Sequence, residues 1–348
     1  DNCQQWRRLC WSPNCSMLAL GFSNGAVNFY DLFGSNLFNI PPPSTTKESQ
    51  IWTPEHSLAG MFFISARDNS KKWPYELILV DYGGTLRSYY ISPSEGFQEF
   101  HRFRFSKGGV SAVCWDAVHS LLVVSSSPEP THVDLKKEPL GWGISAWRLL
   151  NEQPFYRLAV PSPEDLARVE ARKGFVSWVS SFYSSTTFSV VFKMALSPDG
   201  QLLACLHTCG TISVWLMPSL RLHGLWSLKE QPNFDIQPDN TNKKTRANQL
   251  EDLYPVDISW WAEQKVIIAR RNGAVSVCEL NDLRNMLGET PEFVHGEPRL
   301  SPVCTQKGIL VLECEIDHSQ DGNSSSEEEE SLINKSSALV QTTVYLIT

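Results

Sequence analysis

The chain has 348 residues, of which 42% are hydrophobic, and this content is ample for a packed core. Its net charge of −8 argues against a general nucleic-acid-binding protein, because such proteins normally carry a basic excess. No apolar run approaches the roughly 18 residues of a membrane-spanning helix, so none is expected. The chain opens at Asp1 rather than at Met, and we therefore expect a fragment of a longer protein.

The chain contains nine cysteines, an odd number. Four of them lie inside apolar runs that have the character of strands: Cys10, Cys205, Cys278 and Cys314. Such positions favour buried, reduced thiols over a disulfide framework, and they indicate a cytosolic protein.

Taken in chain order, the first recognisable unit is a three-stranded meander. Apolar and β-branched runs at 6–11, 17–22 and 26–31 are separated by the turns Ser12-Pro13-Asn14 and Ser23-Asn24-Gly25. The Asn24-Gly25 pair, like a later Asn-Gly pair at Asn272, is typical of a type I′ hairpin turn. A meander of this size cannot bury a face alone, so it needs neighbours.

The same unit recurs along the chain. We expect further copies at 58–66, 76–80 and 86–90; at 110–115, 121–124 and 144–148; at 192–196, 202–206 and 211–216; at 256–260, 266–269 and 275–279; and, with two recognisable strands, at 309–314 and 343–346. Gly25, Gly84, Gly143, Gly210 and Gly273 precede the third strands at intervals of 59, 59, 67 and 63 residues. A period of about 60 exceeds the ~40–45 residues of a compact WD repeat, and the surplus falls in loops.

A weaker apolar stretch after each third strand, such as 97–105, predicts a fourth, outer strand. Six four-stranded units predict an all-β fold, a single WD40-like β-propeller over 1–348. One outer strand of the last copy is missing, and we expect residues upstream of Asp1 to supply it in a ring of six or seven blades.

Five polar insertions interrupt the blades. They lie near 40–50, 126–140, 163–188, 231–252 and 317–337. Within the third of them, Ser162 is a plausible N-cap for a short helix over 163–173, with Glu164 and Asp165 in its first turn.

No catalytic or metal-binding motif was found. Gly-x-Ser-x-Gly, His-Glu-x-x-His and a phosphate-binding glycine loop are all absent from the sequence. Cys205, His207 and Cys209 resemble a metal cluster, but no second ligand pair lies at a suitable spacing. We therefore expect no enzyme activity, no metal and no cofactor. The alternative is a propeller enzyme or small-ligand binder that uses acidic residues such as Asp116 or Asp257 at the central channel.

Aromatic residues close most of the third strands, and we expect them to pack between blades rather than to stack on a ligand. They are Tyr30, Tyr89, Trp147, Trp215 and Tyr345, with Cys278 at the equivalent position of the fifth copy.

Two features are candidates for interaction or regulation. Trp260 and Trp261 are adjacent, so in a strand they point to opposite faces, and an exposed one of the pair is a candidate partner-binding residue. Ser326 lies in an acidic run with Glu329 three residues on, which is typical of an acidophilic kinase site.

The basic cluster Lys243-Lys244-Thr245-Arg246 is expected to be a solvated loop.

Several segments outside the repeated strands resemble the N-terminal WD-like propeller of the neuroblastoma-amplified sequence family. They are QWRR at 5–8, YDLFGSNLF at 30–38, GISAWR at 143–148, FKMALSPDG at 192–200 and EQPNFD at 230–235. The resemblance covers nearly the whole chain and includes the acidic stretch before the last strand.

This resemblance implies a non-enzymatic interaction scaffold in a vesicle-tethering complex. It implies partners of the RINT and ZW types and ER SNAREs, a role in Golgi-to-ER retrograde transport, and a link to nonsense-mediated mRNA decay. It also implies a cytoplasmic location, peripheral to the endoplasmic reticulum membrane through partners alone, with no direct nucleic-acid contact. A third interpretation, an adaptor that touches RNA directly, is disfavoured by the charge of −8.

Overall fold

The computed structural model describes residues 6–43, 54–67, 72–105, 108–126, 143–160, 190–231, 254–293, 297–300, 310–316 and 341–347. Contacts between Cα atoms divide the chain into two compact units. Unit 1 comprises Asp1–Phe192 with Pro218–Leu220, and unit 2 comprises Lys193–Met217 with Arg221–Thr348. The predicted helix at 163–173 lies outside the described residues.

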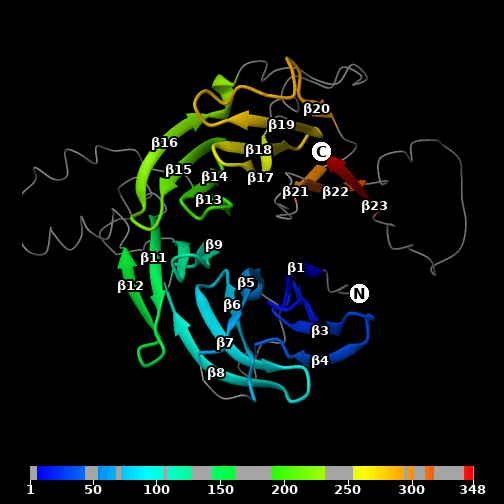
Figure 1. Ribbon diagram of the computed structural model, residues 1–348, viewed down its shortest axis with the longest axis vertical. Helices are drawn as coiled ribbons and strands as arrows, with labels where there is room; N and C mark the ends of the chain where they lie inside the picture. The colour runs from blue at the N-terminus through cyan, green and yellow to red at the C-terminus, as the bar shows by residue number, and fades with distance from the viewer. Residues whose placement is uncertain are drawn as a thin grey trace, which may run out of the picture. The chain divides into compact units, whose positions relative to one another are not determined.

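Unit 1 contains three four-stranded antiparallel sheets, in each of which successive strands are neighbours (Figure 1). The first sheet holds β1 (Trp6–Trp11), β2 (Met17–Phe22), β3 (Val27–Asp31) and β4 (Asn36–Ile40); the second β5 (Leu58–Ser65), β6 (Tyr75–Asp81), β7 (Thr85–Ser92) and β8 (Gly96–Arg104); the third β9 (Val110–Asp116), β10 (Leu121–Ser126), β11 (Gly143–Leu149) and β12 (Tyr156–Val160). A short 3-10 helix, η1 (Pro54–His56), precedes β5.

Unit 2 follows the same plan. Its first sheet holds β13 (Val191–Leu196), β14 (Leu202–His207), β15 (Thr211–Leu216) and β16 (Arg221–Ser227), followed by η3 (Leu228–Glu230); its second β17 (Pro255–Ala262), β18 (Lys265–Arg270), β19 (Ala274–Glu279) and β20 (Glu292–Phe293); its third β21 (Glu297–Leu300), β22 (Leu310–Ile316) and β23 (Gln341–Ile347). The last sheet therefore has three strands among the described residues, one more than the two recognised from the sequence.

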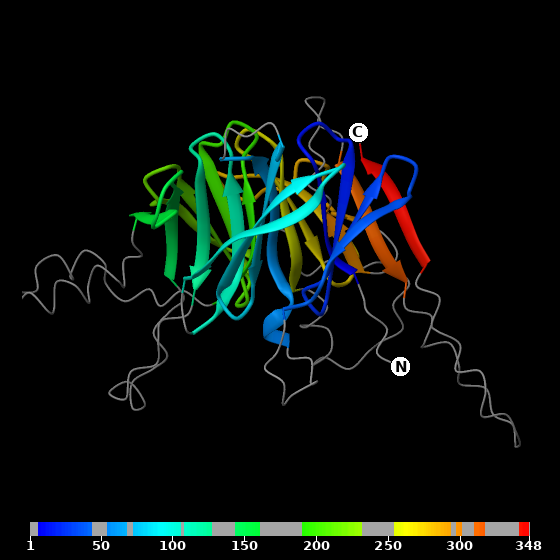
Figure 2. The ribbon, with the colours of Figure 1, turned by 90° about the horizontal axis from the view of Figure 1, so that it is seen from below.

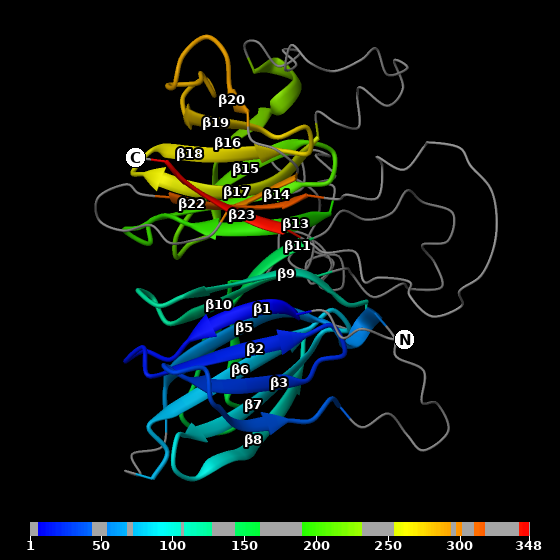
Figure 3. The same ribbon diagram turned by 90° about the vertical axis from the view of Figure 1, so that its right-hand side faces the viewer.

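The second strand of each sheet lies in its interior, and β6 shows why its sequence is a continuous apolar run. Leu77 and Leu79 belong to a core cluster with the sheet β1–β4, whereas Ile78 and Val80 belong to a cluster with the sheet β9–β12. Alternate residues of a strand point to opposite faces, so both faces of β6 are covered. Figure 3 shows the layered strands of the first two sheets.

Inter-sheet packing in unit 2 has the same character. Ile267 and Val275 share a core cluster with Leu300 of β21. In addition, the indole Nε1 of Trp260 donates a hydrogen bond of 2.8 Å to the carbonyl of Ala195, which ties β17 to β13. Four-stranded meanders that stack face to face are the blades of a WD40-like β-propeller, so the predicted fold class is confirmed.

The turn between β2 and β3 differs from the type I′ turn predicted for Asn24-Gly25. The amide of Gly25 donates to the Phe22 carbonyl at 3.0 Å, and the amide of Phe22 donates to the Ala26 carbonyl. Only Gly25 has a positive φ, +80°, whereas a type I′ turn needs positive φ at Asn24 as well. The type I′ prediction is therefore wrong for this turn, which is a three-residue loop ending on a left-handed glycine.

Asn24 instead supports this loop through its side chain, whose Oδ1 accepts from the Ala26 amide at 3.0 Å. In the loop around Asn272, the Gly273 amide likewise donates to the Arg270 carbonyl and the Ala274 amide to Asn272 Oδ1, both at 3.1 Å, and Gly273 but not Asn272 has a positive φ. Gly143, which the spacing placed in a turn, is the first residue of β11 and lacks the positive φ of the turn glycines.

Two turn glycines give a matched test of this geometry. A Cβ on Gly25 would lie 2.5 Å from the carbonyl oxygen of His56, whereas the nearest atom to a Cβ on Gly210 is 3.8 Å away; both residues have φ of +80°. We expect Gly210→Ala to lower the free energy of unfolding by about 1 kcal/mol, and Gly25→Ala by about 3 kcal/mol because a backbone carbonyl must also move. Urea unfolding of the two variants measures the difference, and equal losses would contradict it.

Candidate functional site

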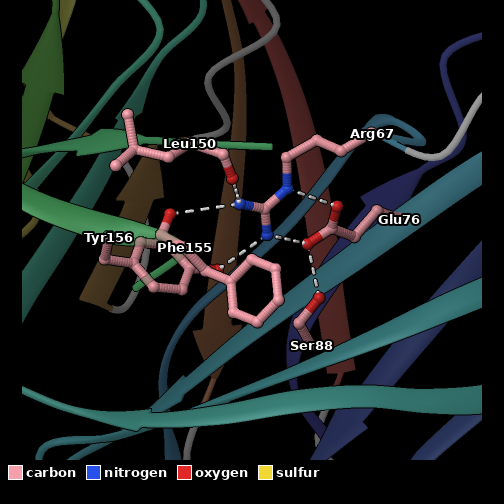
Figure 4. A network of polar contacts seen from close by, with 6 residues as sticks. All are labelled: Arg67, Glu76, Ser88, Leu150, Phe155 and Tyr156. Carbon is pink, nitrogen blue, oxygen red and sulfur yellow. Dashed lines mark hydrogen bonds and ion pairs between the residues drawn. The ribbon is translucent and has the colours of Figure 1, made fainter. Parts of the chain in front are cut away.

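A heavily bonded polar group among the described residues of unit 1 is the buried ion pair of Arg67 and Glu76 (Figure 4). Arg67 follows β5, and its side chain is 7% exposed; Glu76 lies in β6 with a side chain that is 0% exposed. Arg67 Nε donates to Glu76 Oε2 at 2.8 Å, and Nη2 donates to Oε1. The hydroxyl of Ser88 in β7 also donates to Oε1, so the carboxylate is well satisfied.

Arg67 also reaches the neighbouring sheet. Its Nη1 donates to the carbonyls of Leu150 and Phe155, at 2.7 and 3.2 Å, in the β11–β12 hairpin, and its Nη2 donates to the hydroxyl of Tyr156 at 3.3 Å. A guanidinium has five N–H hydrogens, and here five acceptors surround it. No donor is left for a substrate or a phosphate, so the pair acts as a clamp between two sheets.

Aromatic rings enclose this clamp. The Arg67 guanidinium carbon lies 5.3 to 5.9 Å from the ring centroids of Phe100, Phe155 and Tyr156, within the range of cation–π attraction. The same burial raises the pKa of the Tyr156 phenol. The hydroxyl therefore stays protonated at neutral pH and is not a candidate base.

His101 stacks on Phe155, with ring centroids 4.6 Å apart. Both of its ring nitrogens are buried and lack a hydrogen-bond partner within the described part of the chain. Desolvation, and secondly the positive charge of Arg67, lower the pKa of His101 to about 4, while Glu76 opposes this shift. The imidazole is thus neutral at physiological pH and serves as a packing ring.

Unit 2 contains a second buried polar centre. Gln231, which follows η3, accepts from Arg270 Nη2 through its Oε1 and donates to the Cys278 sulfur at 3.1 Å through its Nε2. Burial raises the pKa of the Cys278 thiol to about 12, so it is an inert structural thiol rather than a nucleophile. This centre joins the segment after β16 to β18 and β19.

The acidic residues of the alternative hypothesis both have structural partners. Asp116 is fully buried and pairs with His119 Nδ1 at 2.7 Å, while its Oδ1 accepts from the Val118 and His119 amides. Asp257 pairs with Lys193 at 2.9 Å and accepts from the Leu300 amide. These contacts tie strands and turns together, so neither carboxylate is presented to a ligand.

The cysteine and histidine residues around β14 do not form a metal site. His207 Nε2 lies 2.7 Å from the Ser213 hydroxyl, which also accepts from Trp215 Nε1 at 2.9 Å. Cys209 is exposed in the following turn, whereas Cys205 is buried in the strand. Among the described residues, no group of three or more His, Cys, Asp or Glu side chains could hold a metal ion.

The aromatic residues that close the third strands contribute to packing. Trp147 and Trp215 each donate from Nε1 to a serine two residues earlier, at 3.0 and 2.9 Å. Tyr89 and Trp215 are buried, and Tyr30 and Trp147 are half-buried. The side chain of Tyr345 lies outside the described residues.

The two candidate tryptophans have different surroundings. Trp260 is 2% exposed and lies in the core, whereas Trp261 is half-buried against the cluster around Ile267. A partner-binding role for Trp261 stays a prediction, and the burial of Trp260 leaves it no surface for a partner. Ser326, Cys314 and the basic cluster at 243–246 lie outside the described side chains.

Sequence reasoning missed an exposed apolar turn between β3 and β4. Leu32 and Phe33 at its tip are 65% and 93% exposed. The carboxylate Oδ1 of Asp31 accepts from the amides of Phe33 and Ser35 at 2.9 and 2.8 Å, and Gly34 has φ of +81°. The signal in the sequence was two large apolar residues between Asp31 and Gly34, where turn chemistry calls for small or polar ones.

Comparison with known proteins identifies relatives over most of the chain. The family model described as "Neuroblastoma-amplified sequence, N terminal" matches residues 1–240. A human protein described as "NBAS subunit of NRZ tethering complex" is 37% identical over 325 residues, which cover 90% of this chain. The alignment covers 13% of that relative, so the chain corresponds to a small part of its length. The name of this relative is that of a subunit of a tethering complex.

Among solved structures, a chain of the "Crystal Structure of Mitotic Checkpoint Complex" aligns with a TM-score of 0.49 and 11% sequence identity. The alignment covers 90% of this chain and 73% of that chain. No helix in the described ranges is long and apolar enough to cross a membrane.

The clamp predicts an asymmetry between buried and exposed ion pairs. Arg67→Met leaves the Glu76 carboxylate buried without its charge partner, and we expect it to lower the free energy of unfolding by about 3–5 kcal/mol. Arg102→Met is the matched control: it removes the exposed pair with Glu99, whose side chains are 57% and 41% exposed, and should cost less than about 1 kcal/mol. Denaturant unfolding measures both, and a similar small loss for each would show that Arg67 is no clamp.

His101 predicts a dependence of stability on pH. Its folded pKa of about 4 is below the ordinary value of 6.5, so the unfolded chain binds the proton more tightly. The stability that neutral His101 provides is complete above about pH 6.5 and is lost as pH falls toward 4. His101→Phe, which keeps the stacked ring, should lose less stability than the wild type between pH 7 and pH 4.5. Equal pH profiles from urea unfolding at each pH would rule out this role.

Proposed function

The chain belongs to the neuroblastoma-amplified sequence family, and on this premise we propose that it is a non-enzymatic, protein-binding part of a vesicle-tethering subunit. The observation that carries the proposal is the 37% identity to a named tethering-complex subunit, sustained over 90% of this chain.

The physical properties of the chain support this role. Blade sheets with buried interiors form a rigid support, and loops and turns on such a support are well suited to present contact residues. The buried Arg67 guanidinium is bonded to protein acceptors through all of its N–H groups and leaves no donor for a substrate. We propose further that residues 1–348 form one propeller domain.

The finer assignment is that this subunit acts in Golgi-to-ER retrograde transport. Its partners would be the RINT-type and ZW-type subunits of the complex and the ER SNAREs, and it would lie in the cytoplasm at the endoplasmic reticulum, held there by these partners. A second role in nonsense-mediated mRNA decay would also proceed through protein contacts, since the net charge of −8 disfavours direct binding to RNA.

Deletion of residues 1–348 from the full-length protein tests the proposal. We expect the truncated protein to lose affinity for at least one of the RINT-type subunit, the ZW-type subunit and the ER SNAREs in pairwise binding assays with purified proteins. The matched control is the full-length Arg102→Met variant, which changes an exposed ion pair and should bind as the wild type does. Unchanged affinity for all these partners after deletion would refute a partner-binding role for this part of the chain.

A further inference from the structure

Two arginines face each other across the β11–β12 hairpin of unit 1. The strand register places Arg148 of β11 directly opposite Arg157 of β12, and both residues are exposed. The two strands are adjacent and coloured green, at the left of Figure 1 and of Figure 2. Residues directly opposite in antiparallel strands point to the same face, with Cβ atoms about 4.5–5.5 Å apart. The two guanidinium groups can therefore reach one point above that face.

This arginine pair has no acidic partner in the described part of the chain. Neither Arg148 nor Arg157 makes an ion pair or a side-chain hydrogen bond there. The acidic residues in the described ranges of this sheet, 108–126 and 143–160, are Asp116 and Glu152. Asp116 is buried and bonded to His119, and Glu152 is exposed in the hairpin turn. Like charges directly opposite each other destabilise a sheet, so the pair favours a bound anion.

The arginine pair points away from the neighbouring sheet β5–β8. Trp147 and Tyr156, which precede the two arginines in their strands, pack in the core cluster that this sheet shares with β5–β8. Successive residues of a strand point to opposite faces, so Arg148 and Arg157 lie on the other face of the hairpin. The exposed arginines of β8 are therefore not part of the pair.

The hairpin that carries the arginine pair is anchored from behind. Tyr156 is 2% exposed, and its hydroxyl accepts a hydrogen bond from Arg67. Arg67 also donates to the carbonyls of Leu150 and Phe155, at the closed end of the hairpin. Because the clamp fixes this backbone, the binding of an anion requires mainly the ordering of two side chains.

The number and shape of the charges indicate the class of ligand. Each guanidinium presents a planar fork of N–H donors that matches the oxygens of carboxylates and phosphates. A phosphomonoester carries a charge of about −1.5 to −2 at pH 7 and offers three acceptor oxygens. Two opposed forks, each with one positive charge, match such a group in charge and in acceptors. A carboxylate, with one negative charge and two oxygens, satisfies one fork.

The small number of basic residues indicates the source of the phosphate. Polybasic segments that recognise anionic membranes have about 4–8 lysines and arginines, and nucleic-acid binding neutralises several phosphates at once. The described ranges of this sheet contain Arg148 and Arg157 and no other lysine or arginine. A single phosphate on a protein side chain fits this pair.

We propose that Arg148 and Arg157 together bind the phosphate of a phosphorylated side chain on a partner protein. Each guanidinium donates two N–H bonds to the phosphate oxygens, and the bound dianion relieves the repulsion across the hairpin. The inference rests on the protein-binding role proposed above and adds the chemical group that the partner presents.

Chemical modification of arginines in the full-length protein tests the site. Phenylglyoxal modifies accessible guanidinium groups, and mass spectrometry of peptides measures the rate at each arginine. We expect about 10 mM N-acetylphosphoserine amide to slow modification of Arg148 and Arg157 about threefold, because phosphate occupies both forks. Arg104, a single exposed arginine of β8, is the internal control and should keep its rate. N-acetylglutamate amide at the same concentration should protect the pair less. Equal rates with and without phosphoserine at Arg148 and Arg157 would overturn the proposal.

The full-length Arg157→Gln variant tests whether the two arginines act as one site. Arg157 is exposed, so the substitution should leave the urea midpoint unchanged. Phosphoserine should then protect Arg148 no more than it protects Arg104, because one fork is missing. Arg104→Gln is the matched control and should leave the protection of Arg148 intact. Undiminished protection of Arg148 in Arg157→Gln would show that the arginines do not share a ligand.

Two further measurements separate the alternatives. Vesicles of phosphatidylcholine with phosphatidic acid also present phosphomonoesters; if they protect the pair while N-acetylphosphoserine amide does not, the ligand is a membrane and the assignment to a protein is wrong. Deletion of residues 1–348 tests the proposed function independently. Loss of partner binding on deletion, with an unprotected arginine pair, leaves the function standing and removes the phosphate site. Unchanged partner binding, with a protected pair, leaves an anion site and refutes the function.

Discussion

The structure depends on the fact that a four-stranded blade cannot exclude water from its two faces by itself. The strand β6 makes this plain, because Leu77 and Leu79 need one neighbouring sheet while Ile78 and Val80 need another. Burial of apolar surface contributes roughly 25 cal/mol per Å², so each sheet is stable chiefly because its neighbours cover it. The repeat along the sequence is the consequence, since every blade must offer the same kind of face to the next.

Stacking by apolar contact alone would leave the sheets free to slide, and buried polar groups fix their relative position. Arg67 meets acceptors on β6 and on the β11–β12 hairpin, and Gln231 does the same for β18 and β19. Such groups are costly to bury unless every hydrogen bond is made, which makes them selective for one arrangement. In the Arg67 clamp every guanidinium N–H is bonded within the protein, so the group has no donor left for a ligand.

At the surface of the first sheet, a large apolar residue is exposed instead of buried. Phe33 has a large apolar side chain of the kind that is usually buried in a core, yet the turn that carries it leaves it exposed to solvent. The turn backbone is ordered by Asp31, so the exposure is built into the local structure and does not result from a loose end.

The sequence by itself predicted most of the strands, four of the five turn glycines and the repeat, and hence the blade architecture, because these follow from local periodicity and backbone preference. Only the tertiary structure showed that Asn24 lies in a three-residue loop, that Arg67 finds its five acceptors from residues up to 89 positions away, and that Phe33 is exposed while Trp260 is buried. Burial and long-range pairing depend on which sheets meet, and no local pattern in the chain encodes that.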